Sequence, residues 1–184
     1  MSAADPRGRA VVIVASTRAA AGEYQDRTGP VIAAWLAERG YRVGAPIVRA
    51  DGPGVAAALA EAVAGGARVI LTTGGTGITP TDRTPEATRP LLDLEIPGIM
   101  EEARRIGTAH TPTAVLTRGH AGLARGTFVM NLPGSPGGVR DGLGLLDRIL
   151  DHVLEQARGA VHPSTDPAAG TARPDAAPDA GARA

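Results

Sequence analysis

The chain has 184 residues, of which 43% are hydrophobic and 2% aromatic, so we expect one domain with an aliphatic core. Nineteen basic residues balance nineteen acidic ones, which argues against recruitment of nucleic acid or a membrane surface by net charge. All nineteen basic residues are arginine, and cysteine is absent. This composition excludes a Schiff-base or P-loop lysine, disulfides and cysteine-ligated metals, and it leaves backbone N–H groups, arginine and metal ions to hold phosphate.

The chain divides by composition into three parts. Residues 1–8 are predicted to be a flexible N-terminus, 9–159 a folded α/β domain, and 160–184 a disordered tail rich in Ala, Pro and Gly. The N-terminus lacks the apolar core of a signal peptide, and no segment reaches the roughly 18 apolar residues of a membrane span. We therefore predict a cytoplasmic protein.

The first third of the domain alternates between strand and helix patterns. Residues 9–17 are predicted as a buried strand, 28–40 as a helix and 41–48 as a second strand. Gly44 and Pro46 weaken the second strand and favour a place near the sheet edge. The helix carries one predicted apolar stripe, which consists of Val31, Ala34, Trp35 and Glu38.

The same alternation continues to the end of the domain. In chain order we predict a helix over 52–66, a strand over 67–73, helices near Thr84 and over 97–106, strands over 113–116 and 127–132, and a long helix over 134–159. Repeated β-α units predict a three-layer, Rossmann-like α/β fold, with a mainly parallel sheet and helices on both faces.

Ligands of such sheets bind beyond the carboxyl ends of the strands. The third strand ends in "TTGGTG", where Gly74, Gly75 and Gly77 would let backbone N–H groups converge on a phosphate, with hydroxyls from Thr73 and Thr76. A tight strand-to-helix turn explains the same glycines equally well. The segment matches neither the dinucleotide-binding pattern, because Pro80 replaces its last glycine, nor a P-loop.

Two aspartates follow strand ends. Asp82 lies just beyond the glycines and Asp51 follows the second strand, so the two carboxylates are candidate Mg²⁺ ligands. The alternatives are a helix cap for Asp82 and an ordinary turn for Asp51. Glu86 is a weaker candidate, because an acidic residue is favoured in the first turn of any helix.

Residues before two helices allow a double interpretation. Ser135, ahead of Pro136, and Asp26 with Thr28, ahead of the first helix, are each a candidate anion or substrate contact and equally a plain N-cap. The four histidines show no metal-ligand spacing.

Taken together, these motifs resemble the MoaB/Mog family of molybdopterin-binding domains. The resemblance spans about residues 9–158, and its most specific block is "TTGGTGITPTDRTPEA". The segments "DRTGP", "IPGIMEEAR", "TRGHAG" and "LPGSPGG" support it in the family's order. Each motif is weak alone, whereas the ordered set is specific.

The resemblance implies that AMP is transferred from ATP to the terminal phosphate of molybdopterin with Mg²⁺, giving adenylyl-molybdopterin and pyrophosphate. It carries the family's acidic positions onto Asp51 and Asp82, and its phosphate and pterin loops onto Gly74, Gly75, Thr76, Gly77 and Ser135. It also implies a homotrimer, with a hexamer as the alternative, and hand-over to a molybdate-inserting protein.

One motif departs from the family, because Thr117 stands where its members usually have serine before arginine, with Gly119 and His120 following. The family also contains members that bind molybdopterin without evident adenylylation. A non-catalytic molybdopterin-binding or carrier protein is therefore the second hypothesis.

Overall fold

The computed structural model describes residues 7–23 and 25–159. The predicted tail, 160–184, and most of the predicted N-terminal segment lie outside the described residues. The strands are β1 (Arg9–Ala15), β2 (Arg42–Val43), β3 (Ile47–Arg49), β4 (Val69–Thr73), β5 (Leu94–Glu95), β6 (Ala121–Ala124) and β7 (Thr127–Leu132). The α-helices are α1 (Thr17–Ala20), α2 (Gly29–Glu38), α3 (Pro53–Ala64), α4 (Thr84–Thr88), α5 (Pro97–Thr108) and α6 (Pro136–Gln156), and the 3₁₀-helices are η1 (Arg89–Leu91) and η2 (Pro112–Leu116).

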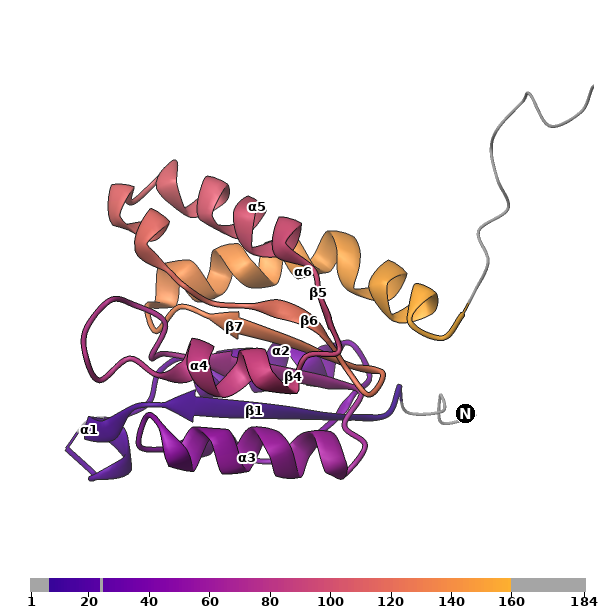
Figure 1. Ribbon diagram of the computed structural model, residues 1–184, viewed down its shortest axis with the longest axis horizontal. Coiled ribbons are helices and arrows are strands. Elements are labelled where there is room, and N and C mark those ends of the chain that lie inside the picture. Colours follow the sequence, from indigo (N-terminus) through magenta and orange to yellow (C-terminus); the bar gives the residue numbers. More distant parts are fainter. Residues whose placement is uncertain (1–6, 24, 160–184) are drawn as a thin grey trace, which may run out of the picture.

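One seven-stranded sheet organises the domain. Its order is β2-β1-β4-β7-β6-β5, and β3 also pairs with β1. β1, β4 and β7 pair in parallel in the centre, and β2 and β3 extend the parallel part, whereas β6 pairs antiparallel with both β7 and β5. The register aligns Val14 with Thr73 and Thr73 with Leu132, so the central strands end together, at the left of Figure 1.

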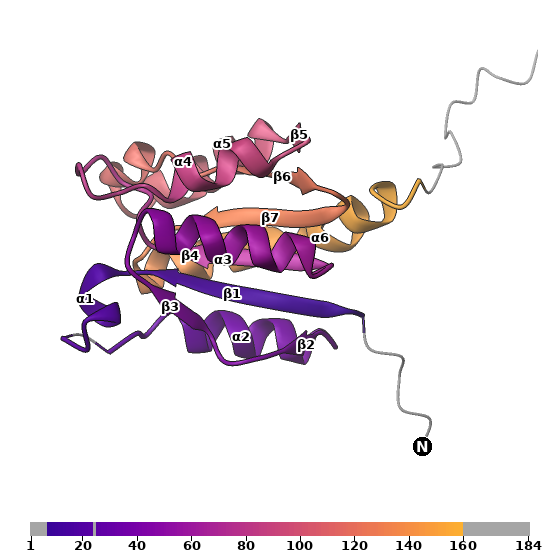
Figure 2. The same cartoon turned by 60° about the horizontal axis from the view of Figure 1, so that its bottom comes forward.

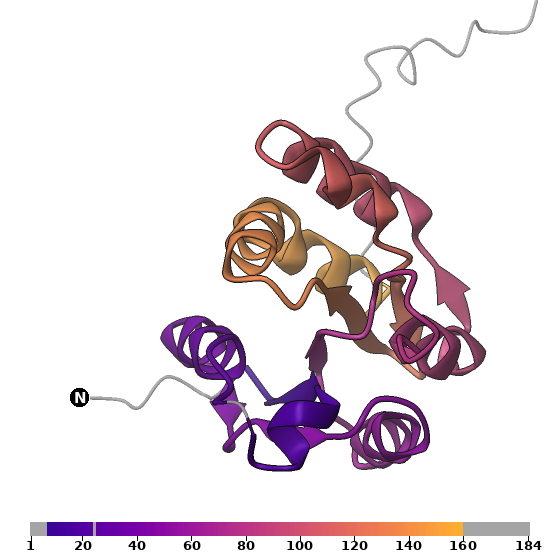
Figure 3. The same cartoon turned by 90° about the vertical axis from the view of Figure 1, so that its left-hand side faces the viewer.

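Helices cover both faces of the sheet, as predicted. On one face, buried side chains of α2, α5 and α6 pack against β1, β4 and β7, and on the other face α3 packs with the segment around α4. Figure 3, which looks along the sheet, shows α2 and α6 on one side and α3 on the other. The result is the expected three-layer α/β fold.

Two strand predictions need correction. The segment 41–48 is not one strand: β2 and β3 are separated by Gly44, Ala45 and Pro46, and both lie at the edge beside β1, as Figure 2 shows. The segment 113–116 is not a strand but part of η2, because Pro112 sets a helical φ at its first position. Val115 and Leu116 are exposed there, so the β-branched pattern did not mark a buried strand.

The predicted apolar stripe of the first helix was wrong except for Trp35. Val31 is 48% exposed and Ala34 and Glu38 are exposed, whereas Ile32, Trp35 and Leu36 are buried. The helix is apolar on several sides, so periodicity alone did not identify its buried face. Contact with α6 decides the orientation, because the indole Nε1 of Trp35 donates to Asp147 at 3.2 Å.

We expect Ile32→Ala to lower the free energy of unfolding by about 2–5 kcal/mol, because the substitution leaves a cavity at a fully buried position. The neighbouring Val31→Ala is the control and should change it by less than about 0.5 kcal/mol. Urea unfolding of both variants measures the difference. Equal costs at the two positions would contradict this orientation of α2.

Candidate functional site

A pocket of about 1020 Å³ opens at the carboxyl ends of the central strands. One wall is the glycine-rich loop, residues 74–83, and the opposite walls are the segment from α5 to η2 and the beginning of α6. Charged side chains in the lining belong to Asp82, Arg140 and Asp141. The pocket therefore lies where ligands of open α/β sheets bind.

The glycines of this loop meet neighbouring chain segments at close range. Gly74 and Gly75 have positive φ angles of 89° and 62°, which disfavour a side chain. A Cβ on Gly74 would collide with the carbonyl of Ala15, and one on Gly75 with the carboxylate of Asp51. The turn itself therefore requires glycine at both positions, whether or not a ligand binds there.

The carboxylate of Asp51 holds the far end of the loop. It accepts from the N–H groups of Gly52 at 2.8 Å and Arg83 at 3.1 Å, and from the hydroxyl of Thr84 at 3.3 Å. Burial raises the pKa of Asp51 above its ordinary value, these hydrogen bonds oppose the rise, and the nearby charge of Asp82 adds to it. Asp51 lies behind the loop and is not part of the pocket lining.

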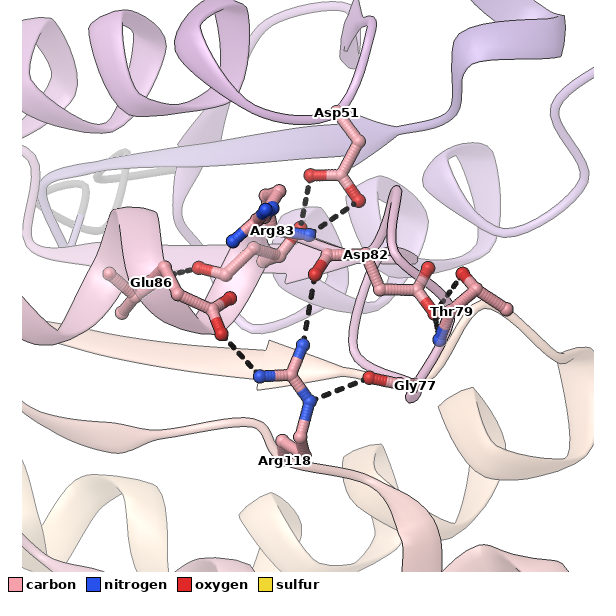
Figure 4. Close-up of polar contacts among 9 residues, drawn as sticks. Asp51, Gly77, Thr79, Asp82, Arg83, Glu86 and Arg118 are labelled. Carbon is pink, nitrogen blue, oxygen red and sulfur yellow. Dashed lines mark hydrogen bonds and ion pairs between the residues drawn. The ribbon is translucent and has the colours of Figure 1, made fainter.

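Asp82 lies in the pocket lining and closes a turn within the loop. Its Oδ2 accepts from the backbone N–H of Thr79 at 3.0 Å and from the Thr79 hydroxyl at 2.6 Å. A Cβ on Gly77 would lie 2.8 Å from this oxygen. Figure 4 shows the Asp82 carboxylate turned toward Thr79, while that of Asp51 faces Arg83.

Arg118, in the connection between η2 and β6, binds the loop from the side opposite Asp51 (Figure 4). Its Nε donates to the carbonyl of Gly77 at 2.7 Å, its Nη2 to the carbonyl of Asp82 at 2.9 Å, and its Nη1 pairs with Glu86. The hydrogen bond from Arg118 lowers the pKa of Glu86 below its ordinary value. The sequence analysis did not assign Arg118 a role.

A buried polar network lies beneath the loop. The side-chain amide of Asn131 donates to the hydroxyls of Thr72 at 3.0 Å and Thr88 at 2.9 Å, and its oxygen accepts from the N–H of His120 at 2.9 Å. Because Thr72, Thr88 and Asn131 are fully buried, their hydrogen bonds fix the relative positions of β4, β7 and α4. The signal for this network in the sequence is a single asparagine in the mostly apolar strand 127–132.

Ser135 is confirmed as the N-cap of α6, since its side chain accepts from the N–H of Gly138 at 3.2 Å, and it lies in the pocket lining. Asp26 lies outside the lining of this pocket. Its carboxylate accepts hydrogen bonds from the N–H groups of Thr28 and Gly29, at the start of α2. Asp26, Thr28 and Thr73 line a smaller hollow of about 120 Å³ beside the main pocket.

The predicted residues thus divide into groups. Those that share the main pocket are Gly74, Gly75, Thr76, Gly77, Asp82 and Ser135, whereas Asp51 supports the loop from behind and Thr73 and Asp26 lie at the smaller hollow. The wall from α5 to η2, which includes His110 and Leu116, was missed. Its last residues read as a strand pattern, so the sequence placed them in the sheet.

Two negative findings apply to the described residues, 7–23 and 25–159. In that part of the chain, no group of three or more His, Asp or Glu side chains is placed to hold a metal ion by itself. No helix there is both long and apolar enough to cross a membrane.

Comparison of the chain with known proteins shows which family and which proteins it resembles. The family model described as "Probable molybdopterin binding domain" matches residues 11–152. The chain is 41% identical over 152 residues to a molybdopterin adenylyltransferase of Pyrococcus furiosus, covering 80% of this chain and 89% of that protein. It is also 41% identical over 154 residues to a molybdenum cofactor biosynthesis bifunctional protein of Synechococcus elongatus, covering 83% of this chain but only 48% of that longer relative.

A solved structure has the same fold. The Mog protein of Mycobacterium ulcerans superposes with a TM-score of 0.78 at 51% identity, covering 81% of this chain and 98% of that one.

We expect Gly75→Ala to lower the free energy of unfolding by about 1–2 kcal/mol or more, because the residue is left-handed and its Cβ would displace Asp51. Gly144→Ala, at an open helical position in α6, is the control and should raise it by about 0.5–1 kcal/mol. Chemical denaturation compares the two. Unchanged stability of Gly75→Ala would contradict the tight contact.

Proposed function

The chain belongs to the MoaB/Mog family of molybdopterin-binding domains, and we propose that it is a molybdopterin adenylyltransferase of molybdenum cofactor biosynthesis. In the proposed reaction, AMP passes from ATP to the terminal phosphate of molybdopterin, and adenylyl-molybdopterin and pyrophosphate are released. Both substrates are phosphate-bearing anions, so the site must bind phosphate without lysine.

The observation that carries the proposal is the set of free donors in the pocket. In the described part of the chain, the backbone N–H groups of residues 75 to 78 donate no hydrogen bond, and all four residues line the pocket. Successive unpaired N–H groups at a positive-φ turn form a concave anion site. The first turn of α6, with Gly137 and Gly138 in the same lining, adds the positive end of a 21-residue helix.

The chemistry requires no side-chain nucleophile. A phosphate oxygen of molybdopterin attacks the α-phosphorus of ATP, a new P–O–P bond forms, and the bond to the pyrophosphate leaving group breaks. The chain's contribution is to hold the two phosphates in line and to offset their repulsion. The glycine-rich loop and the start of α6 face one pocket, which suits this alignment.

Mg²⁺ is the proposed cation of the site, bound by acidic side chains together with substrate. Mg²⁺ is typically held by one or two carboxylates, with substrate phosphates and water completing its shell. Asp82 lines the pocket, and its negative charge raises the pKa of the neighbouring Asp51 after the larger effect of burial. Since a cation near both carboxylates would relieve that repulsion, we propose that Asp82 holds it from the pocket and that Asp51, behind the loop, is the second acidic residue. Bound Mg²⁺ would neutralise charge developing on the phosphates.

The second candidate is a carrier that binds molybdopterin but transfers no AMP. It uses the same loops, and the family resemblance supports it as well. Release of pyrophosphate from ATP in the presence of molybdopterin separates the two.

We propose Ser135, Asp26 and Thr73 as further substrate contacts. We also propose that the product is handed over to a molybdate-inserting protein.

We expect Asp82→Ala to reduce pyrophosphate release at least about tenfold and to weaken the dependence of the rate on Mg²⁺ concentration. The exposed Glu61→Ala on α3 is the matched control and should behave as the unmodified protein. Thermal melts of both variants exclude a loss of fold. Turnover of Asp82→Ala within about threefold of the unmodified protein would contradict a metal-holding role.

Family resemblance also leads us to propose a homotrimer, with a hexamer as the alternative. Light scattering at micromolar concentration should give a mass that is three or six times 18.6 kDa. A monomeric mass would refute this proposal.

A further inference from the structure

Arg118 donates hydrogen bonds to three carbonyls of the glycine-rich loop. Its side chain donates to the carbonyls of Gly77 and Asp82, at 2.7 and 2.9 Å, and its backbone N–H donates to the carbonyl of Thr76 at 2.8 Å. These three carbonyls therefore point toward the connection between η2 and β6. Such a set of contacts constrains how the peptide groups of the loop are turned.

The planarity of the peptide group turns this constraint into a direction for the N–H groups. In a trans peptide, the C=O of one residue and the N–H of the next point in opposite directions, and the described residues contain no cis peptide bond. The peptide between Asp82 and Arg83 demonstrates the rule: its C=O faces Arg118, and its N–H donates to Asp51 at 3.1 Å. Figure 4 shows both contacts on opposite sides of the loop.

The same rule applies to Gly77 and Ile78. Because the carbonyls of Thr76 and Gly77 face Arg118, the N–H groups of Gly77 and Ile78 point away from it. Both residues line the pocket, whereas Arg118 does not. The two N–H groups also donate no hydrogen bond within the described part of the chain.

We propose that Arg118 is a positioning residue, which holds the carbonyls of the glycine-rich loop on one side so that the N–H groups of Gly77 and Ile78 face the pocket and receive a phosphate. The proposal rests on the phosphate-binding role of the pocket under the proposed function. It assigns Arg118 an effect on the ligand that passes entirely through the backbone.

Direct contact between Arg118 and the ligand is the competing explanation, and the structure disfavours it. Its three side-chain nitrogens are all engaged, by Gly77, Asp82 and Glu86. The Glu86 carboxylate offsets its positive charge, so little is left to attract a phosphate. The planar guanidinium suits the bridging role, since it reaches two carbonyls at once, whereas the ammonium of a lysine is a point charge without this fork.

The test uses inorganic pyrophosphate as the probe and follows backbone amide signals of the full chain by NMR. In the unmodified protein, titration should shift the signals of Gly77 and Ile78. Arg118→Ala should weaken binding at least about tenfold, and Arg118→Lys should not restore it, although the positive charge is kept. Arg105→Ala is the matched control, because Arg105 forms a comparable ion pair with Glu102 on α5, and it should bind pyrophosphate normally.

Three results would overturn the proposal. The first is absence of any shift at Gly77 and Ile78 in the unmodified protein, and the second is normal affinity in a folded Arg118→Ala. The third is full recovery in Arg118→Lys, which would mean that the charge acts directly. Thermal melts show which variants are folded, and if Arg118→Ala is not, Arg118→Lys decides the question.

Failure of the proposed reaction gives a different pattern. If the unmodified protein binds pyrophosphate through these two amides but releases none from ATP and molybdopterin, the adenylyltransferase proposal is wrong, and the role of Arg118 in phosphate binding remains supported.

Discussion

Parallel pairing of β1, β4 and β7 is the constraint on which the rest of the structure depends. It brings the ends of three strands, each followed by small residues, to one edge of the sheet. The backbone of the glycine-rich loop then lies so close to Ala15 that a Cβ on Gly74 would strike its carbonyl. Small residues are therefore required for packing before any ligand is considered. The N–H groups of residues 75 to 78, which line the pocket, donate no hydrogen bond within the described part of the chain.

Opposite charges hold this loop from its two sides. The carboxylate of Asp51 accepts hydrogen bonds from N–H and hydroxyl groups near the start of α4. The guanidinium of Arg118 donates hydrogen bonds to carbonyls on the other side of the loop. An anchored loop loses less conformational entropy when a ligand binds, which favours affinity. The buried amide of Asn131 adds rigidity beneath, because its hydrogen bonds link β4 to α4.

The absence of lysine shapes the proposed chemistry. The proposed reaction involves two anions, so a chain of balanced charge would rely on local donors. These are the free backbone N–H groups, the amino end of α6, Arg140 in the lining and the proposed metal ion. In this proposal, phosphate binding depends on the geometry of these donors more than on net charge. This dependence is why a residue outside the pocket, Arg118, can matter for a ligand that it does not touch.

The sequence by itself determined the α/β class, the buried central strands, the helices α3 and α6 and the clustering of glycines with Asp82 and Ser135 at the strand ends. These features follow from local periodicity, turn chemistry and the rule that parallel strands end at one edge. The split of 41–48, the 3₁₀ conformation of 113–116 and the buried face of α2 depended on contacts with other elements. Only the tertiary structure placed Asp51 behind the loop, Asp26 at a separate hollow and Arg118 across from Asp51, because each position is set by segments more than thirty residues away along the chain or by the packing of neighbouring helices.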